Sequence, residues 1–159
     1  MYSLVGFVAG AILAVASAVV FAQVLFRYVF EQPLAWAEEG SRFLFIWVAL
    51  LGAALAVRNR SHFAIGIIVD RCPKPIQEAV RVLTALLGTY IFGLMVTEGW
   101  TLVLLNQNQE SPAIGLTMSI PYAVIPISGL LMIYFTWSDL ILHWRHENDV
   151  DDADALLVD

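Results

Sequence analysis

Four long apolar stretches constrain this chain more than any other feature of its sequence. The first, residues 1–26, contains no charged side chain, and about 20 apolar residues in a helix are enough to cross the hydrocarbon core of a bilayer. Hydrophobic residues make up 60% of the 159 residues and charged residues only 14%. A soluble fold of this size cannot hide so much apolar surface. We therefore predict an all-α integral membrane protein with four helices.

The predicted spans belong to a single transmembrane domain, residues 1–145, and lie at about residues 3–27, 41–58, 82–105 and 120–142. Residues 16–18 (ASA) resemble the cleavage site of a secretory signal. However, no Lys or Arg precedes the apolar run and the run continues past that site, so we expect the first span to be retained. The second helix is expected to begin at Pro33, because Pro is favoured in the first helical turn.

Basic residues are unevenly distributed and predict the orientation. Residues 58–81 contain five of the eight: Arg58, Arg60, Arg71, Lys74 and Arg81. Arg145 lies at the last span's end, and only Arg27 and Arg42 flank the first loop. The positive-inside rule then places both termini in the cytoplasm. Within residues 58–75 the apolar core is only about eight residues long, too short to cross the membrane. We therefore expect an interfacial amphipathic segment between spans two and three.

The acidic tail, residues 146–159, is predicted to be a solvated, disordered, cytoplasmic end. Five of the 14 acidic residues fall in the last eleven positions, and such charge density opposes folding. No basic patch with interleaved aromatic residues supports nucleic-acid binding.

Ionisable residues inside a span are costly and usually functional, and Glu98 is the candidate that we identify. It lies near the end of span three, where it is expected to reach the outer interface in a structural role rather than a coupling one.

His62, His143 and His146 lie at or beyond span ends, so haem ligation between helices is not supported. His143 and His146, three residues apart, suit a shared metal, but basic groups at a helix end need no metal to explain them. We predict no catalytic residues, no metal site and no cofactor. Cys72 is the single cysteine of the sequence, and thiol–disulfide chemistry within one chain requires a pair.

Small residues recur at every fourth position of span one, a pattern that allows close approach of another helix. These are Gly6, Gly10, Ala14, Ala18 and Ala22. The pattern predicts a helix–helix contact and leaves open whether the partner is internal or another subunit.

The start of the second helix, residues 33–42, is the most informative polar segment. On a helix Arg42 is three residues from Glu39 and four from Glu38, so one guanidinium can serve both carboxylates. This segment is either a solvated helix start with its own ion pairs or an interfacial anchor that contacts a partner.

In order and spacing, several short segments resemble those of the small membrane subunit of tripartite ATP-independent periplasmic (TRAP) transporters, the DctQ-like family. They are FRYVF at 26–30, PLAWAEE at 33–39, RFLFIW at 42–47, LGAA at 51–54, Arg58 with SH at 61–62, IIVD at 67–70, SPAIG at 111–115, IPY at 120–122 and Pro126. The resemblance extends over about residues 20–135.

The resemblance implies a scaffold subunit in a secondary active transporter that imports organic acids by sodium symport. It also implies a multi-pass protein of the bacterial inner membrane. Its partners are then a large multi-span permease subunit, expected as a separate polypeptide, a periplasmic substrate-binding protein, and membrane lipid. The implied subunit-interface or docking residues are Arg27, Trp36, Glu38, Glu39 and Arg42, on the periplasmic side. His62 and Asp70 match family positions in the cytoplasmic surface segment, where a structural role is expected.

Two other functions are considered. A self-sufficient small multidrug-type transporter requires a membrane-embedded carboxylate, and the first span has none, so Glu98 would have to serve. A membrane adaptor is a further alternative. A four-span enzyme or electron carrier lacks paired cysteines and intrahelical histidines.

Overall fold

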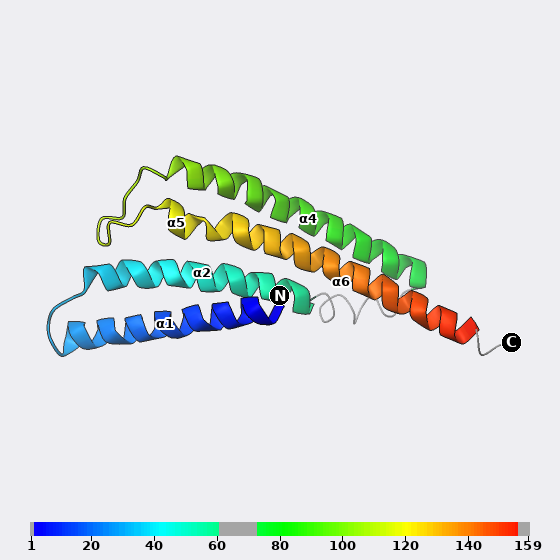
Figure 1. Cartoon of the computed structure of the whole chain (residues 1–159), viewed down its shortest axis with the longest axis horizontal. Helices are drawn as coiled ribbons and strands as arrows, with labels where there is room; N and C mark the ends of the chain where they lie inside the picture. The colour runs from blue at the N-terminus through cyan, green and yellow to red at the C-terminus, as the bar shows by residue number, and fades with distance from the viewer. Residues whose placement is uncertain (1, 61–72, 156–159) are drawn as a thin grey trace.

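The computed structural model describes residues 2–60 and 73–155, in which the regular elements are helices (Figure 1). They are α1 (Tyr2–Tyr28), α2 (Ala35–Arg60), α4 (Lys74–Leu105), α5 (Ser119–Tyr122) and α6 (Val124–Ala155). Four stretches are long and apolar enough to cross a membrane: Ser3–Tyr28, Ala35–Arg58, Ile76–Leu105 and Ser119–Leu142. The predicted all-α, four-span fold is confirmed. The predicted interfacial segment falls largely on residues 61–72, outside the described residues, as do His62, Asp70 and Cys72.

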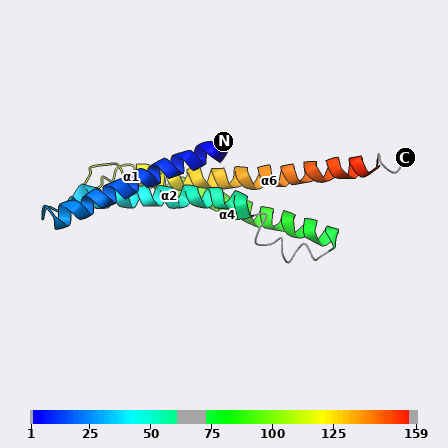
Figure 2. The same cartoon turned by 90° about the horizontal axis from the view of Figure 1, so that it is seen from below.

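The four long helices form an open row. Helix α1 packs on α2, α2 packs on α6, and α6 packs on α4, so that α6 lies between α2 and α4 (Figure 1). Figure 2 shows α1 crossing α2 obliquely, while α4 and α6 diverge toward the C-terminal end of α6. The loops 29–34 and 106–118 lie at the same end of the row, opposite the N-terminus (Figure 1). In this arrangement α1, at one edge, has a single helical neighbour among the described helices.

The core between these helices is thin and rich in small residues. Ala9 of α1, Leu51 of α2 and Val124 of α6 form one buried cluster. A second cluster joins α2 to α6 through Ala54, Met132 and Phe135, with Phe92 and Met95 of α4 packed against it. Small side chains let helices approach closely, and close contact drives helix association where lipid competes with every apolar group.

Two glycines allow the contact between α4 and α6. A Cβ atom on Gly99 would lie 2.8 Å from Cγ2 of Ile125 and 2.9 Å from Cδ of Pro126. A Cβ atom on Gly129 would lie 3.0 Å from the carbonyl oxygen of Phe92. A methyl group on Gly99 would force its neighbours to move, and one on Gly129 would be tighter than most Cβ contacts, so glycine at these positions favours the close packing of the two helices.

The helix ends differ from the sequence prediction in three places. Helix α2 begins at Ala35 rather than at Pro33, because the carbonyl of Leu34 accepts the first N–H groups, those of Ala37 and Glu38, at 3.1 and 3.3 Å. The fourth span is divided between α5 and α6, since Pro126 lacks the N–H that would continue the ladder. The predicted disorder of the tail is wrong for residues 146–155, which continue α6. Residues 130–159 contain no Gly or Pro, the two residues that most strongly disfavour a helix, so α6 can continue into the tail.

Candidate docking and packing sites

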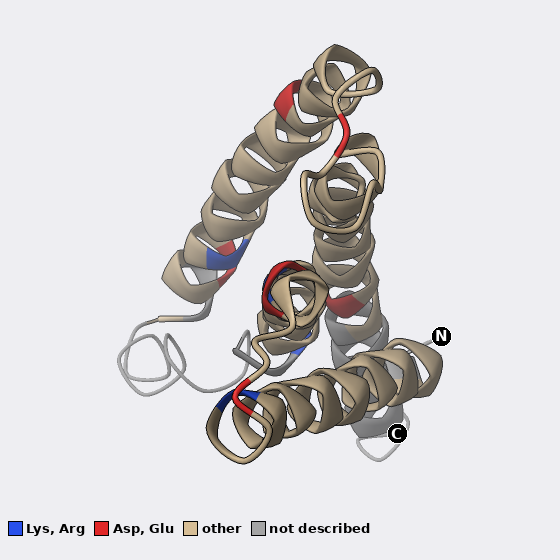
Figure 3. Cartoon of the chain, turned by 90° about the vertical axis from the view of Figure 1, so that its left-hand side faces the viewer, with Lys and Arg blue, Asp and Glu red and all other residues tan. Residues whose placement is uncertain are grey.

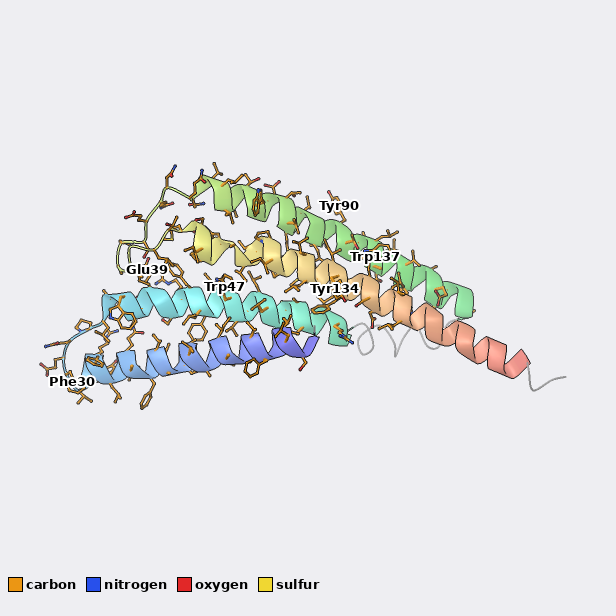
Figure 4. The ribbon with its side chains drawn as sticks, in the orientation of Figure 1. Phe30, Glu39, Trp47, Tyr90, Tyr134 and Trp137 are labelled. Carbon is orange, nitrogen blue, oxygen red and sulfur yellow. The ribbon has the colours of Figure 1, made fainter. Side chains whose placement is uncertain are left out.

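Glu39 joins the start of α2 to the loop between α4 and α5. One oxygen of its carboxylate, Oε2, accepts hydrogen bonds from the hydroxyl of Ser111 and, at 3.0 Å, from the backbone N–H of Ala113. In Figure 4 the Glu39 side chain points from α2 toward this loop. Ser111 is buried at 3% exposure, and Glu39 is half-buried. A carboxylate that accepts two hydrogen bonds in a partly buried site makes stronger bonds than a neutral acceptor, so this contact fixes the loop on α2.

The loop is folded to present these donors. Gly115 has a φ of +72°, a conformation that favours glycine, and its N–H donates to the carbonyl of Ser111 at 2.9 Å. The N–H of Ser111 donates a hydrogen bond to the carbonyl of Leu116 at 2.8 Å. The Ser111 hydroxyl accepts a hydrogen bond from the N–H of Ile114 at 3.3 Å. These bonds close residues 111–116 into a compact turn from which the Ser111 hydroxyl and the Ala113 N–H face Glu39.

Glu38 has a different environment from Glu39. It pairs with Arg42 at 3.6 Å, and both side chains are about two-thirds exposed, at 65% and 69%. The prediction that Arg42 serves both carboxylates is therefore wrong, because Glu39 is turned toward the loop, where Ser111 and Ala113 satisfy it. Of the two acids, Glu38 is the one available on the surface.

Arg27 and Trp36 lie at the same end of the molecule. The guanidinium of Arg27 is 6.0 Å from the ring centroid of Tyr28, and Trp36 is 53% exposed. Trp36 lines an open apolar groove of about 440 Å³ between α1 and α2, together with Ala18, Ala22 and Phe26. The structure thus brings two residues of the small-residue stripe next to a predicted docking residue.

The small-residue stripe of α1 does not make the contact with α2. Gly10, Ala14 and Ala18 are exposed, and Gly6 and Ala22 are half-buried. A Cβ atom on Gly6 or Gly10 would have no neighbour within 4 Å. The α1–α2 contact instead buries Ala9 and Ala16, which lie seven residues apart and share one face. Within the described residues the stripe is therefore available for a partner outside this chain.

The spans contain a further ionisable residue, Asp139, besides the Glu98 that was predicted from the sequence. Glu98 is exposed on α4, and Asp139 also lies within the stretch Ser119–Leu142. Asp139 is half-buried and has an interaction partner. Among the described residues no three His, Cys, Asp or Glu side chains are grouped as a metal site would require. Figure 3 shows how few charged residues the described helices carry.

A family model matches residues 16–146, and its description is the DctQ component of tripartite ATP-independent periplasmic transporters. The chain belongs to this family. It is therefore a small permease component of a TRAP transporter, a multi-pass membrane protein and not an enzyme.

Several relatives of this TRAP component are named for the same role. The chain is 34% identical to a TRAP transporter small permease protein of Haemophilus influenzae, over 76% of this chain and 75% of the relative. It is 32% identical to the C4-dicarboxylate TRAP transporter small permease protein DctQ of Rhodobacter capsulatus, over 64% of this chain and 45% of the relative. It is also 33% identical to the isethionate TRAP transporter permease protein DctMQ of Oleidesulfovibrio alaskensis, over 74% of this chain but only 20% of that longer protein.

The residues that carry the Glu39 contact were only partly visible in the sequence. Glu39 and the segment SPAIG at 111–115 were recognised separately, as parts of the family resemblance, but Ser111 and Glu39 are 72 positions apart. The signal that could have joined them is the combination of a polar helix start and a tight polar turn, both at the same predicted membrane surface.

Proposed function

We propose that this TRAP component is a static scaffold that braces a large permease subunit during sodium-coupled import of an organic acid delivered by a periplasmic binding protein. The open row of helices supports this proposal, because within the described residues it leaves many large apolar side chains of α1 and α4 exposed. Large exposed apolar residues occur along both helices, as in Leu4 and Phe7 of α1 or Leu83 and Tyr90 of α4. A membrane helix that is apolar all round suits contact with lipid and with a second membrane protein.

The orientation of the proposed subunit follows from its basic residues. Both termini and the segment between α2 and α4 face the cytoplasm, where Arg58 and Arg81 lie. The loops 29–34 and 106–118 then face the periplasm. This places the Glu39 contact, with Arg27, Trp36, Glu38 and Arg42 around it, on the side from which a binding protein would approach.

Two roles are assigned to the predicted site residues. Glu39 locks the outer loop on α2, so that the periplasmic surface keeps one shape. The exposed pair Glu38–Arg42, with Arg27 and Trp36, forms a polar and aromatic surface for docking, since rim charges of this kind set partner choice and association rate more than affinity. The small-residue stripe Gly6–Ala22 is proposed to contact a helix of the permease.

In this proposal the partner chains, and not this subunit, determine which substrate is bound and transported. Relatives are named for C4-dicarboxylate, isethionate and sialic acid transport, and all three compounds are small organic acids. We therefore propose an organic acid as the substrate class.

Uptake in proteoliposomes tests this proposal. The permease encoded with this chain is reconstituted with and without it, and uptake of labelled succinate, isethionate and sialic acid is measured with the binding protein and a sodium gradient. The proposal predicts uptake of one of these acids only when both membrane components, the binding protein and the gradient are present. Uptake at the same rate without this chain, or without sodium, would contradict the scaffold role or the coupling, respectively.

A further inference from the structure

Glu98 is an ionisable residue on the outward face of a membrane span. Its side chain is exposed, and no hydrogen bond or ion pair joins it to another residue within 2–60 or 73–155. Its neighbour Gly99 is buried against Ile125 and Pro126 of α6. Successive residues of a helix point about 100° apart, so Glu98 leaves the contact with α6 and faces away from the chain.

The apolar surface continues past Glu98 toward the nearer end of α4. Leu102 and Leu105 follow it and are 41% and 74% exposed, and the polar run begins only at Asn106. Seven residues separate Glu98 from Leu105, which is about 10 Å along a helix. Glu98 therefore interrupts an apolar surface that continues for about two helical turns beyond it.

A carboxylate on the apolar face of a membrane-spanning helix needs a partner. An ionised acid facing hydrocarbon is costly, and such residues in membrane proteins almost always face a partner or a water-filled cavity. Since the described chain offers Glu98 neither, its partner must come from another molecule. The chemistry that best offsets a carboxylate in a poorly solvated site is a basic side chain that also donates hydrogen bonds.

Glu98 lies within an exposed seam of branched apolar residues. Spaced three and four residues apart, the seam positions are Leu87, Ile91, Leu94, Glu98 and Leu105, the last seven residues beyond Glu98. This spacing is that of helices packed at a shallow angle, where one polar residue in an apolar seam selects the register of the partner. The seam accordingly has the form of a contact surface for a single helix.

We propose that this seam of α4 binds a transmembrane helix of the large permease subunit, and that an Arg or Lys of that helix pairs with Glu98. The inference rests on the proposed function, because it requires the permease as a partner. It gives Glu98 a role in assembly and register, rather than in ion coupling within this chain.

The first test is co-purification of the permease with tagged variants of this chain from a mild detergent. Glu98→Leu and Glu98→Lys are expected to lower the permease recovered per tagged chain by roughly tenfold or more, because each leaves the partner's buried cation unpaired. Glu110→Leu, which removes an exposed acid from the outer loop, should leave recovery unchanged. The thermal stability of each isolated variant is measured as well, and Glu98→Leu should match the wild type because Glu98 makes no hydrogen bond or ion pair within the described part of the chain.

A second test locates the contact by photo-crosslinking. A photo-reactive amino acid is placed at Ile91, on the seam, or at Leu86, which is similarly exposed at 53% against 56% but points about 140° away. The proposal predicts a crosslink to the permease from Ile91 and not from Leu86. Equal yields from the two positions, a crosslink to a second copy of this chain, or full permease recovery with Glu98→Leu would overturn it. Recovery of no permease with the wild-type chain would overturn the proposed function together with this inference.

Discussion

At the scale of single residues, two adjacent acids have different roles because a helix directs neighbouring side chains to different faces. Glu39 points to the outer loop and accepts hydrogen bonds from Ser111 and Ala113. Glu38 stays on the surface with Arg42. The local sequence suggests that one arginine serves both acids, and only the packing of distant segments decides otherwise.

Replacing Glu39 with Ala should destabilise the protein by about 2 kcal/mol, because hydrogen bonds to a charged group contribute about 1.5–3 kcal/mol each and Glu39 is only half-buried. Thermal unfolding of the purified chain, followed by tryptophan fluorescence, measures the effect as a lower Tm. Glu38→Ala is the matched control. Its ion pair is exposed, so its loss should cost at most about 1 kcal/mol. Equal losses for the two variants would show that the loop contact does not stabilise the fold.

The Glu39 site was predictable in part. The helix start was recognised by its charge spacing, and the segment 111–115 by its resemblance to the family. The hydrogen bond between them was not predictable, because side-chain spacing within one helix carries no information about a segment 72 positions away. The nearby Arg42 offered a sufficient local partner, and that local explanation was wrong for Glu39.

At the scale of helices, the number of spans follows directly from apolar length, whereas their packing order does not. Each stretch is apolar on most sides, so no single face is marked as the internal one. The small-residue stripe of α1 illustrates this limit. It is regular in the sequence, but the internal contact is made by Ala9 and Ala16 on another face. The contact of α4 with α6 depends instead on Gly99 and Gly129.

Gly99→Ala should therefore weaken the α4–α6 contact, because the new methyl group would lie 2.8 Å from Ile125 and 3.1 Å from the backbone nitrogen of Pro126. Overpacking of this kind costs roughly 1–3 kcal/mol. The effect is measured as a decrease in Tm of the purified chain.

Gly93→Ala on the same helix is the matched control. A Cβ atom there meets nothing within 4 Å, and Ala is a better helix former than Gly by about 1 kcal/mol. This variant should unfold at the wild-type temperature or slightly above it. A larger loss for Gly93→Ala than for Gly99→Ala would contradict the described helix contact.

At the scale of the whole molecule, the open row of helices and the uneven distribution of basic residues together describe a subunit that spans the membrane and presents one end to each compartment. The start of α2 and the loop 106–118, which form the Glu39 contact, lie at the end opposite the N-terminus (Figure 1). Under the proposed orientation this end is periplasmic.

Labelling of single cysteines with a membrane-impermeant maleimide tests that orientation. The native Cys72, the single cysteine, is first replaced by Ala. Glu31→Cys and Asn108→Cys should then react in cells whose outer membrane alone is permeabilised, because both positions are exposed on the outer loops. Asp149→Cys, in the tail, should react only after the inner membrane is broken. The opposite pattern would invert the orientation and remove the proposed docking surface from the periplasm.

The most direct test of the scaffold account is purification of the tagged chain from its native membrane in a mild detergent, with mass spectrometry to identify and quantify what accompanies it. The account predicts a stoichiometric permease with many more spans than the four found here, retained in the absence of substrate and sodium. Recovery of this chain alone, as a monomer or as a homo-oligomer, would contradict it.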